Sequence, residues 1–246
     1  MKCAMITPTD FLHYEERAGF GFHFALAQHV KEASYAAWFK RWHEFGHFIM
    51  MDNGAAEGER LDNKDLIEAA GIIGADEVVM PDVLRDKHGT INATRAALSL
   101  VPERNRAMAP QGADWFEWEA CAKILVSYGC ATICIPKLYE GYPGGRAHAL
   151  AIIRGYHWDW DHNIHLLGCY NDPVREIVLA HKHTPWIRSV DTGAPVAYAQ
   201  ADKSLWDEGH ESLDWHKEPN MAQMLYNPGI LRSAASGVID AHRNEK

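Results

Sequence analysis

The feature that most constrains the fold of this chain is a repeated rhythm: a short β-rich run, a polar or Gly/Pro break and, in most cases, a helical stretch. Several β-rich runs, such as EVVMPD and TICIPK, are almost continuously apolar, as expected where a parallel strand is buried on both faces. Strands that alternate with helices predict βαβ units and a parallel sheet. We expect strands at Cys3–Thr7, His23–Ala27, Phe48–Asp52, Glu77–Asp82, Arg106–Gln111, Thr132–Lys137, Ile164–Gly168 and Trp186–Asp191.

Two of the helices carry clear boundary signals. Asp114 is a predicted N-cap and Gly129 a predicted stop for one helix, and Asp172 followed by Pro173 gives the same kind of start to another. We expect helices at His29–Phe45, Lys64–Ile73, Asn92–Leu100, Asp114–Tyr128, Gly145–Tyr156 and Asp172–His181, a short one in APVAYAQA, and a last one at about Met221–His242.

These elements predict an α/β fold, namely a single (β/α)8 TIM barrel with a C-terminal closing helix, in which residues 1–246 form one domain. The length suits this fold, because such barrels commonly use about 250 residues. The alternative is an open doubly wound sheet. No GxGxxG follows an early strand, so a dinucleotide-binding fold loses its main support.

Charge and cysteine usage exclude some functional classes. The formal net charge of −9 counts against a general nucleic-acid coating protein, although an enzyme can still hold a nucleic acid through a few arginines. Five cysteines without a CxxC pair argue against a disulfide framework and a zinc knuckle. No apolar run approaches the ~20 residues of a membrane span, and the first residues lack a signal-peptide pattern, so we expect a cytoplasmic protein.

Chemistry-bearing residues stand at the predicted carboxyl ends of the strands, where a barrel of this kind builds its active site. One such position falls in each βα unit from the third strand onward, so these side chains should converge on one cavity mouth. Three of them are aspartates, and a carboxylate at the end of an apolar strand is costly unless something binds it. The residues are Asp52 and Asn53 in MMDNGAAEG, Asp82 in VVMPDVLRD, Gln111 in MAPQG, Lys137 in IPKLYEG, Gly168 in HLLGCY and Asp191 in IRSVDTG.

The plain alternative is that these aspartates cap the following helices. Asp52 and Asp82 are each followed by a loop, which makes capping a poor explanation, and three together favour function. Several carboxylates can cleave a bond at an anomeric carbon: one attacks C1′ of a sugar to form a covalent intermediate, and a second acts as general acid or base. A third can accept hydrogen bonds from the N–H groups of a heterocyclic base.

The motifs, in this order, resemble those of the tRNA-guanine transglycosylase superfamily, including its short DNA-acting relatives that install 7-deazaguanine bases. The resemblance covers about Phe22 to Ala199. MDNGAAEG resembles the family's Asp-Ser-Gly-Gly motif, VVMPD its next aspartate motif, PQG its Gln-Gly-Gly segment and LLG its Gly-Gly-Leu segment, while SVDT stands where the family carries its nucleophile.

The resemblance implies a role for each matched position. Asp191 inherits the role of nucleophile and Asp52 that of the acid/base aspartate that shuttles a proton. Asp82 matches the aspartate that recognises the purine edge, Gln111 lies against the base carbonyl, and Gly168 offers backbone groups to the base. Asn53, in the first motif, joins the base-binding set.

Two departures from the family pattern bear on the substrate. The aromatic residue that stacks on the base in the tRNA enzymes falls at Ala56, so stacking has to come from elsewhere, with Phe20, Phe22 and Tyr139 as candidates. The family's CxCxxC…H zinc site has no counterpart, and the tRNA enzymes are longer. The short, zinc-free form is more similar to the DNA-acting or virus-encoded branch, which implies no metal, no cofactor and, for a virus-encoded chain, the host cytoplasm.

Two further groups of residues receive a plainer interpretation. HWDWDHNIH, residues 157–165, precedes the seventh strand and is interpreted as a solvated loop on the stability face rather than a metal site. Lys137 and Arg188 are candidates for phosphate or rim contacts.

The sequence therefore predicts a glycosyltransferase that exchanges guanine in a polynucleotide, DNA rather than tRNA, for a 7-deazaguanine base. Three alternatives stay open: a tRNA-guanine transglycosylase, an enzyme that hydrolyses or exchanges bases of free nucleosides, and a non-catalytic barrel that binds a base or a protein partner. The expected partners are a nucleic acid and the second base, without a membrane, and a homodimer is one possible assembly.

Overall fold

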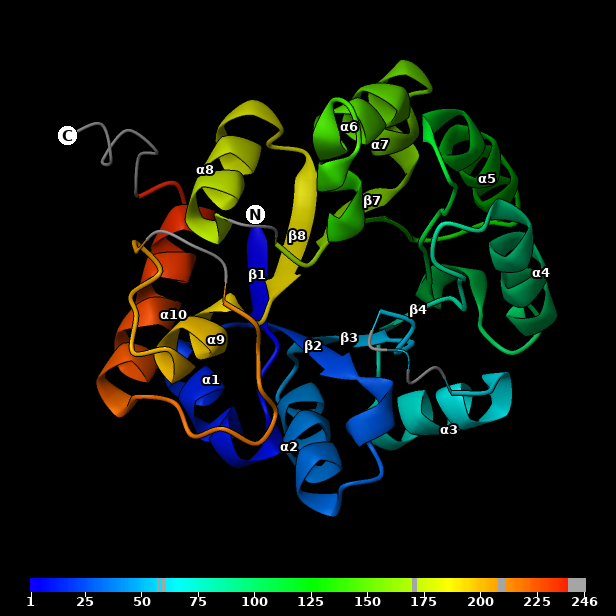
Figure 1. The fold of residues 1–246 in the computed structure, drawn as a ribbon. Coiled ribbons are helices and arrows are strands. Elements are labelled where there is room, and N and C mark those ends of the chain that lie inside the picture. Colours follow the sequence, from blue (N-terminus) through cyan, green and yellow to red (C-terminus); the bar gives the residue numbers. More distant parts are fainter. Residues whose placement is uncertain (57, 59–60, 170–171, 208–210, 239–246) are drawn as a thin grey trace. The chain divides into compact units, whose positions relative to one another are not determined.

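The computed structural model describes residues 1–56, 58, 61–169, 172–207 and 211–238. The fold is α/β: eight parallel strands alternate with helices in the order of a (β/α)8 barrel, as the sequence predicts (Figure 1). The strands follow the order β1-β8-β7-β6-β5-β4-β3-β2 in the sheet. Their bounds are β1 Lys2–Met5, β2 Phe22–Leu26, β3 Phe48–Asp52, β4 Glu77–Val79, β5 Arg106–Met108, β6 Thr132–Pro136, β7 Asn163–Leu167 and β8 Ile187–Thr192.

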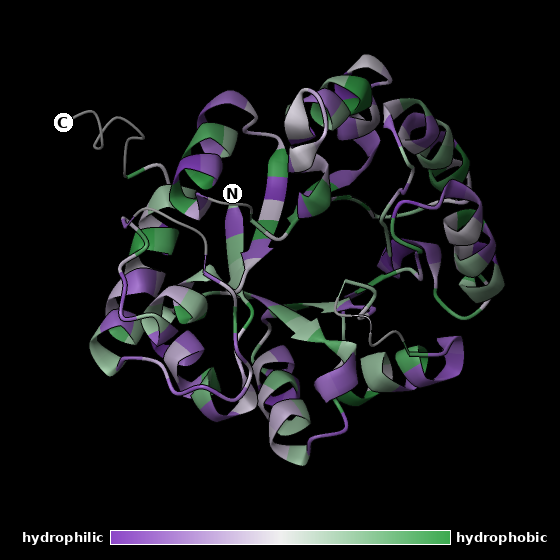
Figure 2. Cartoon of the chain, in the orientation of Figure 1, coloured by the Kyte–Doolittle hydropathy of each residue, from purple (hydrophilic) through white to green (hydrophobic). Residues whose placement is uncertain are grey.

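The helices fall where the sequence places most of them. They are α1 Leu12–Ala18, α2 Ala33–Glu44, α3 Asn63–Ile73, α4 Lys87–Ala97, α5 Trp115–Ser127, α6 Gly145–Gly155, α7 Trp158–Asp161, α8 Pro173–His183, α9 Ala194–Gln200 and α10 Met221–Ala235. Several carry hydrophilic and hydrophobic residues side by side, as amphipathic helices do (Figure 2). None of the helices within the described residues is long and apolar enough to cross a membrane.

Side-chain caps set several helix boundaries. The Asp114 carboxylate accepts a hydrogen bond from the Glu117 backbone N–H, and Asp172 does the same for Arg175, which confirms both predicted N-caps. The helix predicted at Asn92–Leu100 instead begins at Lys87, because Asp86 caps it by accepting from the Gly89 N–H. The last helix ends at Ala235; the predicted end at His242 lies outside the described residues.

Strands β4 and β5 each end three residues earlier than predicted, and the difference places two site residues in loops. Strand β4 ends at Val79 rather than Asp82, and β5 ends at Met108 rather than Gln111. Pro81 and Pro110 explain both ends, because proline has no N–H to continue a hydrogen-bonded ladder.

The chain divides into two compact units, of which the first comprises residues 1–23 and 166–246. Here β1 pairs with β8, Ala4 lying opposite Asp191, and α10 packs on α1, α8, α9 and β1. The buried Glu15 carboxylate lies 2.6 Å from His23 Nδ1, which ties α1 to β2. Burial raises the pKa of the Glu15 carboxyl, while the hydrogen bond from His23 opposes that shift.

The second unit comprises residues 24–165 and contains β3, β4, β5 and β6 as successive parallel pairs. Along the chain these strands alternate with helices α2 to α6, and α7 follows α6. Trp118 is the largest fully buried side chain of this unit. The prediction that residues 1–246 form one domain stays a prediction.

Candidate functional site

The best-defined polar cluster of the second unit is centred on Asp82. Its carboxylate is 5% exposed and accepts hydrogen bonds on both oxygens. Asn53 Nδ2 donates to Oδ1 at 2.8 Å, and Gln111 Nε2 donates to Oδ2 at 2.5 Å. The three residues follow β3, β4 and β5 in turn, so three neighbouring strand ends bring together three residues that the sequence places in one base-binding set.

The two amides have defined directions. Asn53 Nδ2 also donates to the Met80 carbonyl at 2.8 Å, while its Oδ1 accepts from the Ala55 N–H at 2.8 Å. Gln111 Oε1 accepts from the Arg85 N–H at 3.2 Å and from the Tyr139 hydroxyl at 3.0 Å. Both amides therefore turn N–H groups toward Asp82, and such donors stabilise an ionised carboxylate.

None of the three predicted aspartates caps a helix. Asp62 caps α3 and Asp86 caps α4, so Asp52 and Asp82 have no part in either cap. The N-cap of α9 is Gly193, with no side-chain bond. Asp52, at the end of β3 and 8% exposed, accepts instead from the Gly54 N–H in the loop at 3.2 Å. The capping alternative is thereby excluded for these positions.

Asp191 belongs to the first unit and lies within β8, almost fully buried. Its Oδ1 accepts a hydrogen bond of 3.0 Å from the backbone N–H of Gly168, which follows β7. Gly168 has φ 67°, a conformation that residues with a side chain adopt at a cost. Burial, and then the neighbouring Cys169 and Asp191, raise the pKa of the Cys3 thiol well above its usual range, so that thiol is a neutral neighbour of the carboxylate.

The two predicted cations lie in different settings. Lys137 is exposed at the first position after β6, where a rim contact was expected. Arg188 is the second residue of β8, and its guanidinium lies 6.0 Å from the ring of Phe22. Since Ser189 pairs with Lys2 at the start of β1, Arg188 lies at the amino-terminal end of these strands. This position does not support a rim contact.

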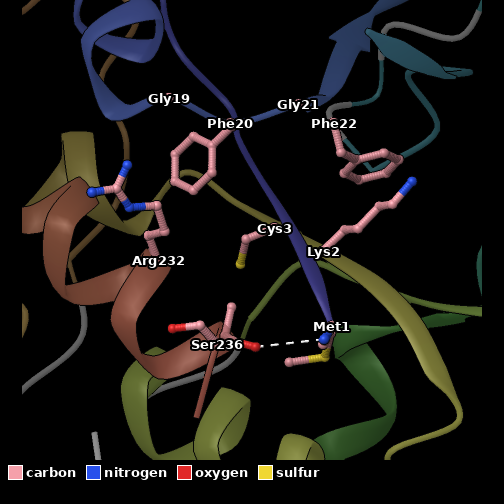
Figure 3. A pocket seen from close by; sticks show the side chains of 10 residues that line it. Met1, Lys2, Cys3, Gly19, Phe20, Gly21, Phe22, Arg232 and Ser236 are labelled. Atoms are coloured by element: carbon pink, nitrogen blue, oxygen red, sulfur yellow. Dashed lines mark hydrogen bonds between the residues drawn. The ribbon is translucent and has the colours of Figure 1, made fainter. Parts of the chain in front are cut away.

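The three candidate stacking residues do not offer an open ring face. Phe20 and Phe22 lie beside Lys2 and Arg232 around a cavity of about 310 Å³ in the first unit (Figure 3). That cavity is at the amino-terminal end of β1, away from the end at which Asp191 lies. Tyr139 is completely buried. No aromatic replacement for the exposed Ala56 is identified among the residues that the structure describes.

Comparison with known proteins adds no identification. No protein-family model matches the chain, and no curated protein matches it. The resemblance to the transglycosylases therefore rests on the motifs alone.

The histidine- and aspartate-rich segment 157–165 is only in part the solvated loop that the sequence predicts: His157, Trp160 and Asp161 are exposed, but other parts of the segment are helical or buried. Trp158–Asp161 forms the short helix α7, the Asp159 side chain is buried against Arg154, and His165 is buried in β7. In the described part of the chain, no group of three or more His, Cys, Asp or Glu side chains is placed to hold a metal ion.

The sequence missed one contributor to the site. The sequence suggests Tyr139 only as a candidate for stacking on the base. In the structure its hydroxyl instead contacts Gln111 and the Gly112 backbone. The only sequence signal is its position two residues after Lys137, in the loop that follows β6.

Proposed function

We propose that this protein is a nucleobase-exchanging glycosyltransferase that replaces guanine in a polynucleotide, DNA rather than tRNA, with a 7-deazaguanine base. The observation that carries the proposal is the buried Asp82 carboxylate, bonded on both oxygens by the amides of Asn53 and Gln111. A carboxylate held in this way is oriented to accept hydrogen bonds from a ligand with adjacent N–H groups. The edge of guanine carries such groups at N1 and at the 2-amino nitrogen.

The chemistry is a double displacement at the sugar. Asp191 attacks C1′, the bond from C1′ to guanine N9 breaks, and Asp52 supplies the proton that N9 takes up. The entering 7-deazaguanine loses its N9 proton to Asp52 and attacks C1′, which releases Asp191. Two displacements retain the configuration at C1′. In duplex DNA the target nucleotide has to be flipped out first, at a cost of a few kcal/mol.

Incorporation of a labelled 7-deazaguanine base tests the proposal. The protein is incubated with the labelled base and with guanine-containing DNA or tRNA in parallel, and the label is counted in each polymer. We expect label in DNA together with release of an equal amount of guanine. Folded protein that labels neither polymer and releases no guanine would contradict the proposal.

A second candidate, base exchange or hydrolysis at free nucleosides, is favoured by the net charge of −9, which disfavours a polyanionic substrate. It uses the same aspartates without phosphate contacts. The two candidates differ in salt dependence, because neutralising phosphates makes binding weaken as salt rises. Nucleoside turnover that is insensitive to salt would favour the second.

A further inference from the structure

Tyr139 has a buried hydroxyl group with one backbone donor and two acceptors within hydrogen-bonding distance. The residue lies in the short 3-10 helix Lys137–Gly141 after β6, and its ring packs 5.2 Å from Trp115 and 5.0 Å from Tyr142, centroid to centroid. Since the ring is completely buried, it cannot stack on a base, and any role in ligand binding has to pass through the hydroxyl.

The direction of the hydroxyl proton follows from the neighbouring donors and acceptors. The Gly112 N–H donates to the Tyr139 oxygen at 3.0 Å. The nearest acceptors for the tyrosine proton are Gln111 Oε1 at 3.0 Å and the Gly112 carbonyl at a weaker 3.4 Å. Burial raises the pKa of the Tyr139 hydroxyl, so it keeps its proton and stays a donor at neutral pH.

Two donors meeting at one end of the Gln111 amide decide which end is the carbonyl. The Tyr139 hydroxyl and the Arg85 N–H both point at this end, so it must be Oε1. The opposite end, 2.5 Å from Asp82 Oδ2, is then the N–H donor. If the amide turned around, the Arg85 N–H would face an NH₂ group and the Asp82 carboxylate would face a carbonyl oxygen. The Tyr139 hydroxyl proton would lose its 3.0 Å acceptor and keep the weaker one, the Gly112 carbonyl at 3.4 Å.

We propose that Tyr139 is a positioning residue for base recognition: its hydroxyl holds the Gln111 amide in the direction that presents N–H to Asp82. The proposal rests on the proposed function for the identity of the ligand but not for the hydrogen bonds. Asn53 is held by the backbone at both ends of its amide, by the Ala55 N–H and the Met80 carbonyl at 2.8 Å each, whereas the Arg85 N–H lies at a longer 3.2 Å from Gln111 Oε1. Asp82 then faces the ligand as an acceptor, which selects purines with paired N–H groups over purines with an acceptor at N1.

Two tyrosine variants separate this role from general packing. Tyr139→Phe removes the hydroxyl and keeps the ring. Tyr142→Phe is the matched control, since its hydroxyl makes only a 3.4 Å contact with the Gly112 carbonyl and does not contact Gln111. We expect Tyr139→Phe to raise the dissociation constant for guanine, and with it KM, about tenfold, and to leave kcat within about twofold. Tyr142→Phe should leave the dissociation constant, KM and kcat unchanged.

A double-mutant cycle tests whether Tyr139 acts through Gln111. In a Gln111→Ala background, Tyr139→Phe should change guanine affinity less than about twofold. The same tenfold loss in both backgrounds would overturn the proposal.

An NMR measurement on the ligand-free protein tests the hydrogen bonds whatever the substrate is. The Gln111 side-chain amide is assigned by its disappearance in Gln111→Glu. In the wild type its protons should show cross-relaxation with the Asn53 amide protons, and their exchange with solvent should be at least about tenfold faster in Tyr139→Phe than in Tyr142→Phe. Cross-relaxation with the Tyr139 ring instead, or equal exchange in both variants, would overturn the positioning role. Absence of guanine binding by the wild type would contradict only the proposed function.

Discussion

Asp82 in the second unit and Asp191 in the first are both buried carboxylates at or just beyond the carboxyl end of a strand, but different kinds of group bind them. Side-chain amides of Asn53 and Gln111 donate to Asp82, whereas the backbone N–H of Gly168 donates to Asp191. An amide side chain can turn around, so other groups have to fix its direction. A backbone N–H is fixed by the conformation of the chain. In the proposed function, base recognition uses side-chain amides whose direction other groups must fix, whereas the proposed nucleophile accepts a hydrogen bond from a donor that the backbone fixes.

The largest expected effect separates the two carboxylates. Asp191→Asn keeps the acceptor oxygen for the Gly168 N–H but removes the nucleophile, so exchange should fall by about 10³-fold or more while guanine still binds. Rates of label incorporation and guanine binding by calorimetry check this. Exchange at the wild-type rate would show that Asp191 is not the nucleophile.

A change at Asp82 should act on binding first. Asp82→Asn places an amide nitrogen against one of the two donors, so guanine affinity should fall about 100-fold, and stability should fall by about 1–3 kcal/mol for the buried donor left without a partner. Asp86→Asn is the control, because this exposed residue caps α4 and asparagine caps equally well. Equal guanine affinity in the wild type and in Asp82→Asn would remove Asp82 from the base site.

A smaller effect tests the backbone side of the comparison. Gly168→Ala introduces a side chain at φ 67°, which costs about 1–2 kcal/mol and shifts the N–H that binds Asp191, so exchange should slow about tenfold. Gly46→Ala is the matched control: its φ is 82°, its new Cβ meets nothing within 4 Å, and it lies between α2 and β3. Both variants should lose similar stability in urea unfolding. Equal activity in the two would mean that the Gly168 N–H does not position the nucleophile.

The smallest effect concerns the cations. Lys137→Ala should weaken DNA binding a few-fold. It should also reduce the slope of the log binding constant against log salt concentration by about one, the value for one phosphate contact. Arg188→Ala should change neither the affinity nor this slope, because Arg188 lies at the amino-terminal end of its strand. Fluorescence titrations at several salt concentrations check both. A larger loss for Arg188→Ala than for Lys137→Ala would reverse the assignment.

Much of the fold could be predicted because hydrophobic periodicity and caps are local signals. The strand Phe48–Asp52 is confirmed to the residue, and the caps at Asp114 and Asp172 are confirmed as well. The predicted start of helix α4, Asn92, is five residues later than the observed start, Lys87. Gly89 disfavours a helix in its first turn, and the N-cap signal at Asp86 therefore received too little weight. Helix α1 was missed, since seven residues give too short a pattern.

The site was predictable only as far as strand order allows. The sequence could bring Asn53, Asp82 and Gln111 together because they follow β3, β4 and β5, which are neighbours in the sheet. The direction of the Gln111 amide was beyond the sequence, since it depends on Tyr139, 28 positions away, and on the backbone of Arg85. Arg188 lies near the amino end of β8, so the strand register gives no support to a rim contact there, and that role stays a prediction.

The most direct test of the account is to capture the covalent intermediate. The protein is incubated with a guanine-containing oligonucleotide without a second base, quenched in acid, digested and mapped by mass spectrometry. With Asp191 as the nucleophile, we expect a glycosyl adduct on the peptide that contains Asp191, lost in Asp191→Asn and kept in Asp86→Asn. An adduct on another carboxylate, or guanine release with no adduct under conditions of rapid turnover, would contradict it.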